Sequence, residues 1–542
     1  MNFMKKTMTN RLLSLAILII TMQSITQPVF AGNGEKDTLS TFATIRVLFR
    51  APAGTTVTLQ NNGAQQLIIS TDSTGVKISN FPAIPDGSSY NITIKSAPKG
   101  MKFKMERASG TINSIATVNI TGDYEYHLIS RGNTSSEMGT FYESWDPVIE
   151  KETSDGNTRY IVFVSQAKGL CGSTGQYRQI FRRDKQTGKT IMLSRAPNGE
   201  EGNGNSFNPV LSVSPYYVVF ESYASNLVGN DGNGVRDIFL WNETLEGANI
   251  ERVSEGMGGV EANAQSFDAS PSGNCSYIAY ASSATNLLND GTEVSGVNIY
   301  LWSRHDKKTK LISKDPKTGK GVGGEKPSID MNGYKVAFWS WSYTLDPNDK
   351  NNLWDIFLYE ENTSRIGLPL RRITMAYDGS ERNQGEESSS RVVTPVISGD
   401  GKFIAYATTA SNVVPGDTNK VQDVFVYDIA GNTTTRVSVN NSGEGGNGDS
   451  PYGQGERIAM TFDGRKVAFT TKASNFGVPG GNVVMYDLDT KKMTSVTNNN
   501  GGYVSTPDIS RKGRYVVFGC SFPLDGRFNS SGLFTKFMTE QP

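Results

Sequence analysis

A six-residue apolar segment recurs seven times along the chain and constrains the fold more than any other feature. The copies are YIVFVS, YVVFES, YIAYAS, KVAFWS, FIAYAT, KVAFTT and YVVFGC, beginning at Tyr160, Tyr217, Tyr277, Lys335, Phe403, Lys466 and Tyr515. Subtracting neighbouring start positions gives spacings of 57, 60, 58, 68, 63 and 49 residues. A polar loop and a second apolar segment, such as DIFLWN or DVFVYD, follow most copies. Several motifs in one fixed order predict a repeat protein.

The repeat from Thr394 to Val439 shows the expected contents of one unit. TPVIS, KFIAYAT, DVFVYD and TTRVSV are predicted strands, and Gly399–Gly401 is a tight turn between the first two. KFIAYAT is nearly all apolar or β-branched, so we expect it to be covered on both faces. TTRVSV alternates with polar residues, which favours an exposed outer edge. Four antiparallel strands of this kind form one blade of a β-propeller.

The order of the repeats also predicts how the ring closes. The last repeat ends after its third strand, near Leu533–Met538, whereas the segment YHLISR at Tyr126–Arg131 matches the fourth-strand segments TKLISK and IERVSE. We therefore expect the early strand to complete the last blade, which leaves only short, protected edges. The predicted fold is all-β, a seven-bladed β-propeller over residues 124–542 preceded by a small β-sandwich.

The N-terminus predicts export. Lys5, Lys6 and Arg11 precede a short apolar run, and small or permissive residues follow before Gly32. This pattern indicates a signal peptide over residues 1–31, with an uncleaved anchor as the alternative, and a linker over 32–40. We expect a monomer that is periplasmic or extracellular. The formal net charge of zero gives no indication of a nucleic-acid partner.

Residues 41–122 read as short alternating strands separated by turns such as NNG and PDGSS, which predict a small immunoglobulin- or transthyretin-like sandwich. The run TTVTLQNNGAQQLIISTDSTGVKISNFPAIPDGSSYNITIKSAPKG resembles the small sandwich repeats of bacterial secreted and surface proteins. That resemblance implies a module that spaces, displays or adheres.

The repeats themselves resemble the TolB-like (WD40-like) propeller repeats of exported bacterial proteins. The motifs that carry the resemblance are ASNLV at 224–228 with DIFL at 237–240, and ASNVV at 410–414 with DVFV at 423–426. The resemblance implies a propeller that binds proteins or other ligands, and it carries no catalytic set.

The loops between the second and third strands contain a repeated polar spacing. Asp231, Asn233 and Asp237 share the pattern D-x-N-x-x-x-D with Asp417, Asn419 and Asp423, and Asp346, Asn348 and Asp349 are a looser copy. Closely spaced carboxylate and amide oxygens suit Ca²⁺, so the two D-x-N-x-x-x-D sets are candidate calcium ligands. The alternative is that these residues brace turns without a metal.

Cysteine and histidine offer little further chemistry. Cys171, Cys275 and Cys520 have no zinc spacing, and one disulfide is possible. The only histidines are His127 and His305, in a predicted strand and a predicted turn, so we predict no catalytic residues.

Long loops predict a working face. In an antiparallel blade the second-to-third loops and the blade-to-blade loops leave the same face, and here both are long and carry acids and aromatic residues. We expect Tyr223, Trp341, Tyr343 and Phe476 to contact a protein or a cell-surface glycan, and Trp339 to pack between blades. Two other functions remain open: a carbohydrate-active hydrolase or lyase with paired acids in the central pocket, and a structural component of the cell envelope.

Overall fold

The computed structural model describes residues 42–51, 55–72, 76–97, 101–124, 126–131, 144–150, 158–214, 216–244, 247–361, 370–385, 392–452, 457–497, 504–521 and 532–538. The described residues are all-β, apart from one 3₁₀ turn at Leu170–Gly172. None of their helices is long and apolar enough to cross a membrane. The predicted signal peptide and linker lie outside the described residues.

The N-terminal strands form two sheets around a common core. The strands are β1 (Phe42–Arg50), β2 (Thr56–Asn61), β3 (Gln65–Ser70), β4 (Val76–Asn80), β5 (Ile84–Pro85), β6 (Ser89–Ser96), β7 (Met101–Glu106), β8 (Ser109–Thr111) and β9 (Ile115–Tyr124). One sheet has the order β4-β1-β9-β7, and the other has the order β3-β2-β6-β8. Alternate residues of β1 and β2, including Val47, Phe49 and Leu59, are fully buried in one apolar cluster. The pair β1 and β9 is parallel, a feature that the strand pattern did not predict.

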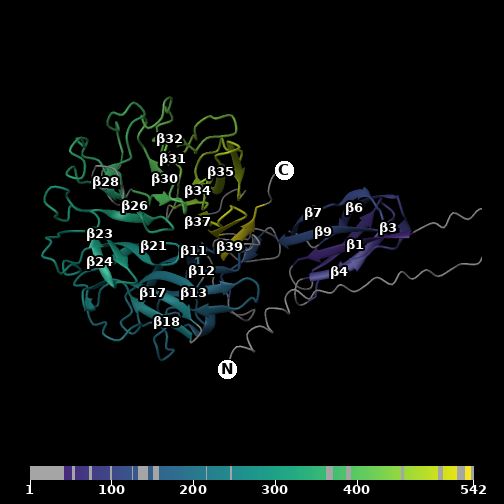
Figure 1. The fold of residues 1–542 in the computed structure, drawn as a ribbon, viewed down its shortest axis with the longest axis horizontal. Coiled ribbons are helices and arrows are strands. Elements are labelled where there is room, and N and C mark those ends of the chain that lie inside the picture. The colour runs from purple at the N-terminus through teal and green to yellow at the C-terminus, as the bar shows by residue number, and fades with distance from the viewer. Residues whose placement is uncertain are drawn as a thin grey trace, which may run out of the picture.

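Seven four-stranded antiparallel sheets follow, and we number them as blades 1 to 7 (Figure 1). Blades 1 to 3 contain β11 (Ser144–Ile149), β12 (Tyr160–Ser165), β13 (Gln179–Asp184) and β14 (Thr190–Met192); β15 (Ser206–Leu211), β16 (Tyr217–Ser222), β17 (Asp237–Thr244) and β18 (Gly247–Arg252); and β21 (Ser266–Pro271), β22 (Tyr277–Ser282), β23 (Asn298–Ser303) and β24 (Lys308–Leu311). A short hairpin of β19 (Glu255–Gly256) and β20 (Val260–Glu261) lies between blades 2 and 3.

The other four blades repeat this order. They contain β25 (Glu325–Ile329), β26 (Lys335–Ser340), β27 (Asp355–Glu360) and β28 (Leu370–Arg372); β29 (Val396–Ile397), β30 (Phe403–Thr408), β31 (Asp423–Asp428) and β32 (Thr433–Arg436); β33 (Ile458–Met460), β34 (Lys466–Thr471), β35 (Asn482–Asp487) and β36 (Lys492–Ser495); and β37 (Val504–Ile509), β38 (Tyr515–Cys520) and β39 (Gly532–Phe537) with β10 (Tyr126–Leu128). The first strands contact one another in sequence, and β11 contacts β37, so the series closes into a ring.

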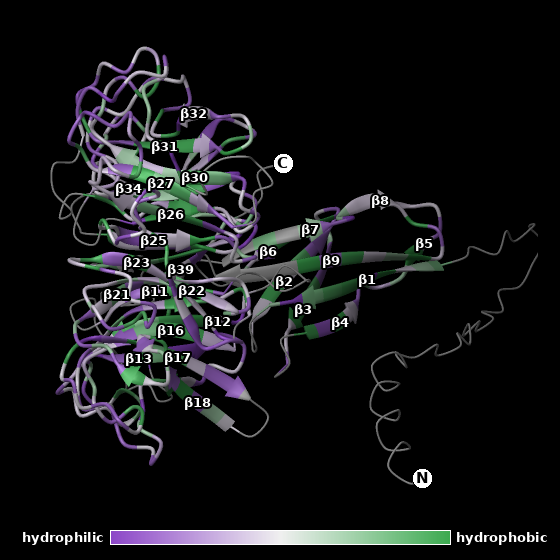
Figure 2. Ribbon diagram, turned by 60° about the vertical axis from the view of Figure 1, so that its left-hand side comes forward, coloured by the Kyte–Doolittle hydropathy of each residue, from purple (hydrophilic) through white to green (hydrophobic). Residues whose placement is uncertain are grey.

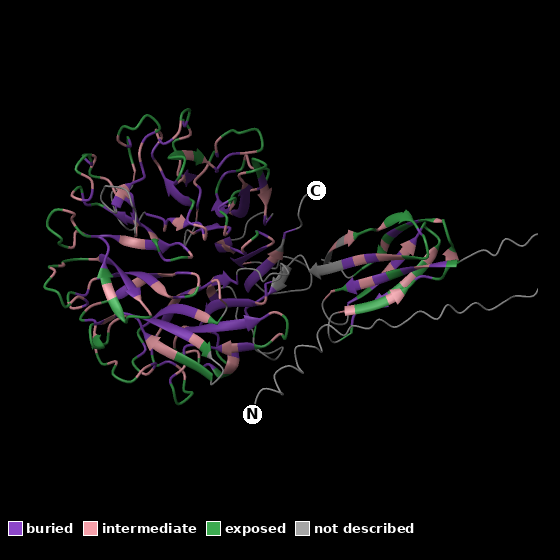
Figure 3. Ribbon diagram, in the orientation of Figure 1, coloured by how far each residue is buried: buried purple, intermediate pink, exposed green. Residues whose placement is uncertain are grey.

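Burial follows the position of a strand within its blade. The second strands are buried along almost their whole length, as their apolar sequences predict, whereas β32 alternates between exposed and half-buried residues. Figure 3 shows the same gradient, with buried strands toward the centre and exposed loops around the rim, and Figure 2 shows hydrophobic strands beneath hydrophilic loops. Cys275 and Cys520 are buried and Cys171 is half-buried, and none of the three forms a disulfide within the described residues.

The last blade is completed by the early strand. β10 pairs antiparallel with β39 in the register Tyr126↔Lys536 to Leu128↔Phe534, which is the pairing that the sequence predicts. A further hydrogen bond joins the two segments beyond the paired residues: the backbone N–H of Leu533 donates to the Ser130 hydroxyl at 3.1 Å. The other blades make the same contact between the third strand and a Ser or Thr two residues after the fourth, as in the pair Ile238 and Ser254 at 2.9 Å.

Candidate binding site on the loop-rich face

The two faces of the propeller differ in how their connections are built. We call the face that carries the second-to-third loops and the blade-to-blade loops the loop-rich face, and the opposite one the turn face. On the turn face the first-to-second turns bond to one another: the N–H of Gly273 donates to the carbonyl of Met331 at 2.8 Å, and the N–H of Met331 donates to the carbonyl of Gly399 at 3.0 Å. Strand β10, the fourth strand of blade 7, begins at the turn face, so the chain enters the propeller from the sandwich at that face. The long loops lie on the opposite, loop-rich face.

Exposed large hydrophobic side chains are concentrated on the loop-rich face. The propeller has eight such residues among those described, and two of them, Tyr216 and Tyr334, belong to the turn face. The six on the loop-rich face are Tyr223, Met257, Val260, Trp341, Tyr343 and Tyr377. The side chains of Trp341 and Tyr343 are among the most exposed, at 60% and 63%. Such residues mark interaction surfaces when they gather on one face.

A repeated pair of asparagines joins the long loops to each other. In blade 2 the N–H of Asn203 donates to Oδ1 of Asn226 at 3.0 Å, and the N–H of Ser225 donates to Oδ1 of Asn203 at 2.8 Å. Nδ2 of Asn226 also donates to the carbonyl of Glu201 at 3.0 Å. We call this arrangement the Asn brace. The same bonds recur in blades 3, 5 and 6, in the pairs Asn263–Asn286, Asn383–Asn412 and Asn447–Asn475.

The second-to-third loop of blade 4 departs from this pattern. Its sequence S-W-S-Y-T-L places Trp341 where the braced blades have Tyr, Ser, Thr or Lys, and Tyr343 where they have the Ser or Thr of the brace. Thr344 replaces the brace asparagine, and the preceding blade-to-blade loop, residues 314–324, contains no asparagine. Both halves of the brace are therefore absent from blade 4, and two exposed aromatic side chains stand in the same loop.

The other two predicted contact residues are less available. Tyr223 is 41% exposed, and its ring packs edge-on against Phe207 at 6.0 Å between centroids. Phe476 is half-buried and packs against the core between blades 5 and 6. The prediction that Trp339 packs between blades is confirmed, because Trp339 is fully buried in a cluster with blade 5 and its Nε1 donates to the carbonyl of Val393 at 2.8 Å.

An arginine lies at each predicted calcium-binding loop. In blade 5, Nη1 of Arg436 is 2.8 Å from Oδ1 of Asp417 and 3.5 Å from Oδ2 of Asp423, and Nδ2 of Asn419 donates to Asp423 at 2.8 Å. In blade 2, Nη1 of Arg252 is 3.7 Å from Oδ1 of Asp231.

The asparagine and the carboxylates of blade 2 follow the same arrangement. Asn233 donates to Asp237 at 3.0 Å, as Asn419 does to Asp423. Burial, together with the charge of Asp237, raises the pKa of Asp231 to about 6. Calcium binding stays a prediction, and an ion at either loop would have to compete with the guanidinium.

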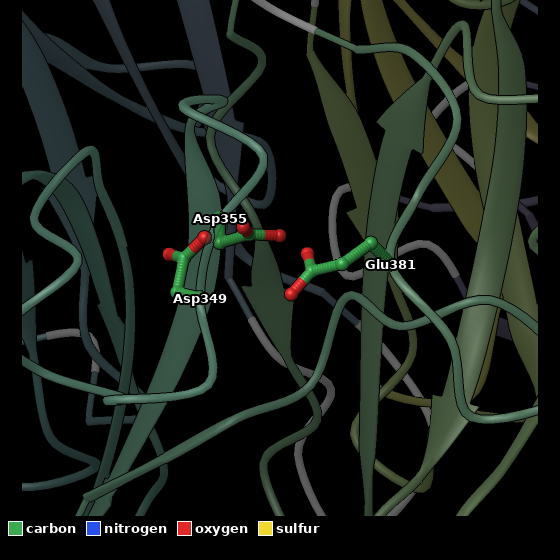
Figure 4. A group of neighbouring side chains, drawn as sticks. All are labelled: Asp349, Asp355 and Glu381. Atoms are coloured by element: carbon green, nitrogen blue, oxygen red, sulfur yellow. The ribbon is translucent and has the colours of Figure 1, made fainter.

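The looser copy in blade 4 forms a larger acidic cluster. Carboxylate oxygens of Asp349, Asp355 and Glu381 lie within 4.8 Å of one another (Figure 4). Nη1 of Arg372 contacts all three, at 3.1, 3.4 and 3.0 Å respectively. Arg372 therefore stands where a cation would bind, and its side chain is 1% exposed.

Whether a blade carries this arginine depends on which residue begins its third strand. Blades 2, 4 and 5 begin it with Asp237, Asp355 and Asp423 and carry Arg252, Arg372 and Arg436 on the fourth strand. Blades 1, 3 and 6 begin it with the amides Gln179, Asn298 and Asn482 and carry Met192, Leu311 and Ser495 instead. The arginine is present where a buried carboxylate needs a counter-charge, which supports a structural role for these aspartates.

The central channel carries one polar residue from each blade near the start of the first strand. We call these seven residues the channel ring: Asp146, Asn208, Asp268, Lys326, Thr394, Arg457 and Thr506. Each of five first strands contains a bulge at this position, with one extra residue relative to the second strand. The extra residue has a positive φ, for example 47° at Asp146, 54° at Lys326 and 40° at Thr506. Bulges next to functional sites re-aim side chains, and sequence reasoning missed this ring although a proline follows five of its members.

A buried carboxylate, Glu221, lines the central cavity together with Asp146 and Asp268, and the paired catalytic acids stay a prediction. Glu221 is fully buried, accepts from Nδ2 of Asn208 at 3.0 Å and from the N–H of Asp268 at 2.8 Å, and pairs with Arg236 at 3.1 Å. Burial, with the charge of Asp268, raises the pKa of Glu221 to about 7. These contacts tie neighbouring blades together, so they indicate a structural carboxylate.

Comparison with known proteins finds solved structures that are similar at low sequence identity. No family model matches the chain, and no curated protein matches it. An oligogalacturonate lyase from Vibrio parahaemolyticus is 11% identical, with 76% of this chain and 91% of that chain covered and a TM-score of 0.44. The β-propeller domain of the Trilobed protease from Pyrococcus furiosus is 12% identical, with 72% and 96% covered and a TM-score of 0.41. TolB from Acinetobacter baumannii is 14% identical, with 72% and 79% covered and a TM-score of 0.32.

Proposed function

We propose that this chain is an exported binding protein that docks a partner protein on the blade 4 sector of its loop-rich face. The observation that carries the proposal is that blade 4 lacks the Asn brace and carries the exposed Trp341 and Tyr343 in the same loop. Four other blades use the position of Tyr343 and the next position to hold the loops together, so the residue types at these two positions are explained by structure alone. The aromatic pair in blade 4 is exposed and has no such explanation within the blade.

The chemistry of the exposed residues supports a protein partner. Trp and Tyr are enriched in the few residues that dominate binding energy, and aromatic residues and Met are enriched in protein interfaces. Tyr377 is exposed in the loop that connects blade 4 to blade 5, and Met257 is exposed on the same face. The braces on the flanking loops restrict their motion, which lowers the ordering cost of docking.

The experiment replaces the two aromatic residues with the residues that a braced blade carries at the equivalent positions. We expect the double variant Trp341→Thr and Tyr343→Ser to fold, because Thr409 and Ser411 occupy the equivalent positions in blade 5. The mature protein, with and without these changes, would be used to capture partners from the envelope of the source organism. Affinity for the recovered partner would then be measured by calorimetry. Loss of a binding hot spot costs about 2 kcal/mol or more, which is roughly a thirtyfold weaker Kd.

Tyr334→Ala is the matched control, because Tyr334 is an aromatic residue of the same blade that is 50% exposed on the turn face. We expect this variant, and His305→Ala, to bind as the parent does. Equal loss in the control and in the double variant would show that the working face is assigned wrongly. If the parent protein captures a glycan and no protein, the proposal of a protein partner is wrong and the ligand is the glycan.

A further inference from the structure

The central channel encloses a cavity of about 420 Å³ that the proposed docking surface does not use. The channel ring lies near its loop-rich end. At the turn-face end, Met331 and Phe462 line the cavity, and both belong to the hydrogen-bonded turns. A volume in this range is typical of small-molecule sites.

The cavity presents an unsatisfied polar group. Thr506 is 7% exposed and lines the cavity, and its hydroxyl has no hydrogen-bond partner among the described residues. Its φ of 40° is unusual for a β-branched residue. A buried hydroxyl without a partner costs free energy, and sparsely populated backbone conformations are concentrated at ligand sites. Both features therefore point to a ligand that hydrogen-bonds there.

The charges of the channel ring are separated around it. Blades 1 to 3 contribute Asp146, an asparagine and Asp268, whereas blades 4 to 6 contribute Lys326, a threonine and Arg457. Asp146 and Lys326 come from blades three positions apart, the largest separation that a ring of seven allows.

Two charged side chains of the channel ring lack a counter-charge among the described residues. Within the described part of the chain, neither Asp146 nor Arg457 forms an ion pair or a side-chain hydrogen bond. Lys326 partly offsets the effect of burial on Asp268, whose pKa is raised mainly by that burial. One half of the ring therefore presents negative charge and the other half positive charge, with a polar group from blade 7 between them.

We propose that the central channel binds a small zwitterionic ligand. Its cationic group would face Asp146 and Asp268, and its anionic group would face Lys326 and Arg457. A ligand with only one charge would satisfy one half of the ring and leave the opposite half without a counter-charge. The proposal does not depend on the docking surface of blade 4.

The test is calorimetric titration of the mature protein with a graded series of ω-amino acids, in which an ammonium and a carboxylate are held at increasing separation. The probes are 4-aminobutyrate, 6-aminohexanoate and 8-aminooctanoate, with hexylamine and hexanoate as the singly charged comparisons. We expect at least one ω-amino acid to bind at least tenfold more tightly than either comparison, because a hydrogen bond to a charged group contributes about 1.5–3 kcal/mol.

Asp146→Asn and Lys326→Met should each weaken binding of that ω-amino acid about tenfold or more. Asp290→Asn and Lys308→Met remove the same charges from exposed positions outside the channel and should leave binding unchanged. The proposal is overturned if no ω-amino acid binds at millimolar concentration, if hexylamine or hexanoate binds as tightly, or if the channel variants bind as the parent does while circular dichroism shows them folded.

Discussion

Blade 4 and the four braced blades share a buried second strand but differ in their loops. Blades 2, 3, 5 and 6 each join two long loops through an Asn brace, and blade 4 has aromatic residues in the same loop. Beneath the loop, Phe338 and Phe357 of blade 4 stack at 6.2 Å, as Tyr406 and Phe425 of blade 5 do at 5.7 Å. Blade 4 therefore keeps the stacked aromatic pair of blade 5 and differs from it in the loop above.

The blades of a repeat protein can be compared with one another to identify functional residues. Every blade must satisfy the same packing and hydrogen-bonding requirements, so a position that all blades fill alike is explained by the fold. A position at which one blade gives up a shared hydrogen-bonded arrangement for exposed aromatic residues is not explained in that way. The other blades of this chain serve as internal controls for blade 4.

The largest expected effect separates two tryptophans of blade 4. Trp339→Ala should lower the free energy of unfolding by about 3–5 kcal/mol, because it removes a fully buried ring and its bond to Val393. Trp341→Ala should change it by less than about 0.5 kcal/mol, because that ring is exposed. Urea denaturation of the two variants measures both values. A large loss for Trp341→Ala would mean that this ring stabilises the fold, and the comparison between blades would then fail.

A somewhat smaller effect is expected from the arginines, which test whether blade 4 shares its interior with blade 5. Arg372→Leu and Arg436→Leu should each cost about 3 kcal/mol, because each leaves buried carboxylates without their counter-charge. Thermal and urea unfolding would measure the loss.

Blade 3 provides the rescue for this experiment, since it carries Asn298 and Leu311 at the equivalent positions. Adding Asp417→Asn and Asp423→Asn to Arg436→Leu should recover most of the lost stability. If the triple variant is no more stable than the single one, the arginine contributes through packing and not through charge. Calcium should stabilise the arginine variants more than the parent if the ion and the guanidinium compete for these oxygens.

The smallest expected effect comes from the Asn brace itself. Asn412→Ala removes the acceptor of the Asn383 N–H and the donor to the Glu381 carbonyl, so we expect a loss of about 1–2 kcal/mol. Thr344→Ala makes the change at the equivalent position of blade 4 and should cost less. Hydrogen exchange at the Asn383 and Ser411 amides should also become faster in Asn412→Ala. Unchanged exchange there would show that the brace does not order the loop-rich face.

Much of the fold could be predicted because its signals are local and repeated. The second strands, the pairing of Tyr126–Leu128 with β39 and the burial of Trp339 all follow from strand patterns read in order. The candidate sites were only partly predictable. Trp341 and Tyr343 were identified as exposed loop residues, but Phe476 was not distinguishable from them, because packing against another blade has no signature in its own loop.

The strands, their order and the closure of the ring follow from the sequence, because each depends on alternation and spacing along the chain. Which distant residues meet depends instead on tertiary packing. It joined Asn383 to Asn412, set Arg372 among three carboxylates, and assembled the channel ring from positions scattered between Asp146 and Thr506. Those contacts depend on how blades pack side by side and on bulges that re-aim single side chains, and these are geometric properties that no local pattern specifies.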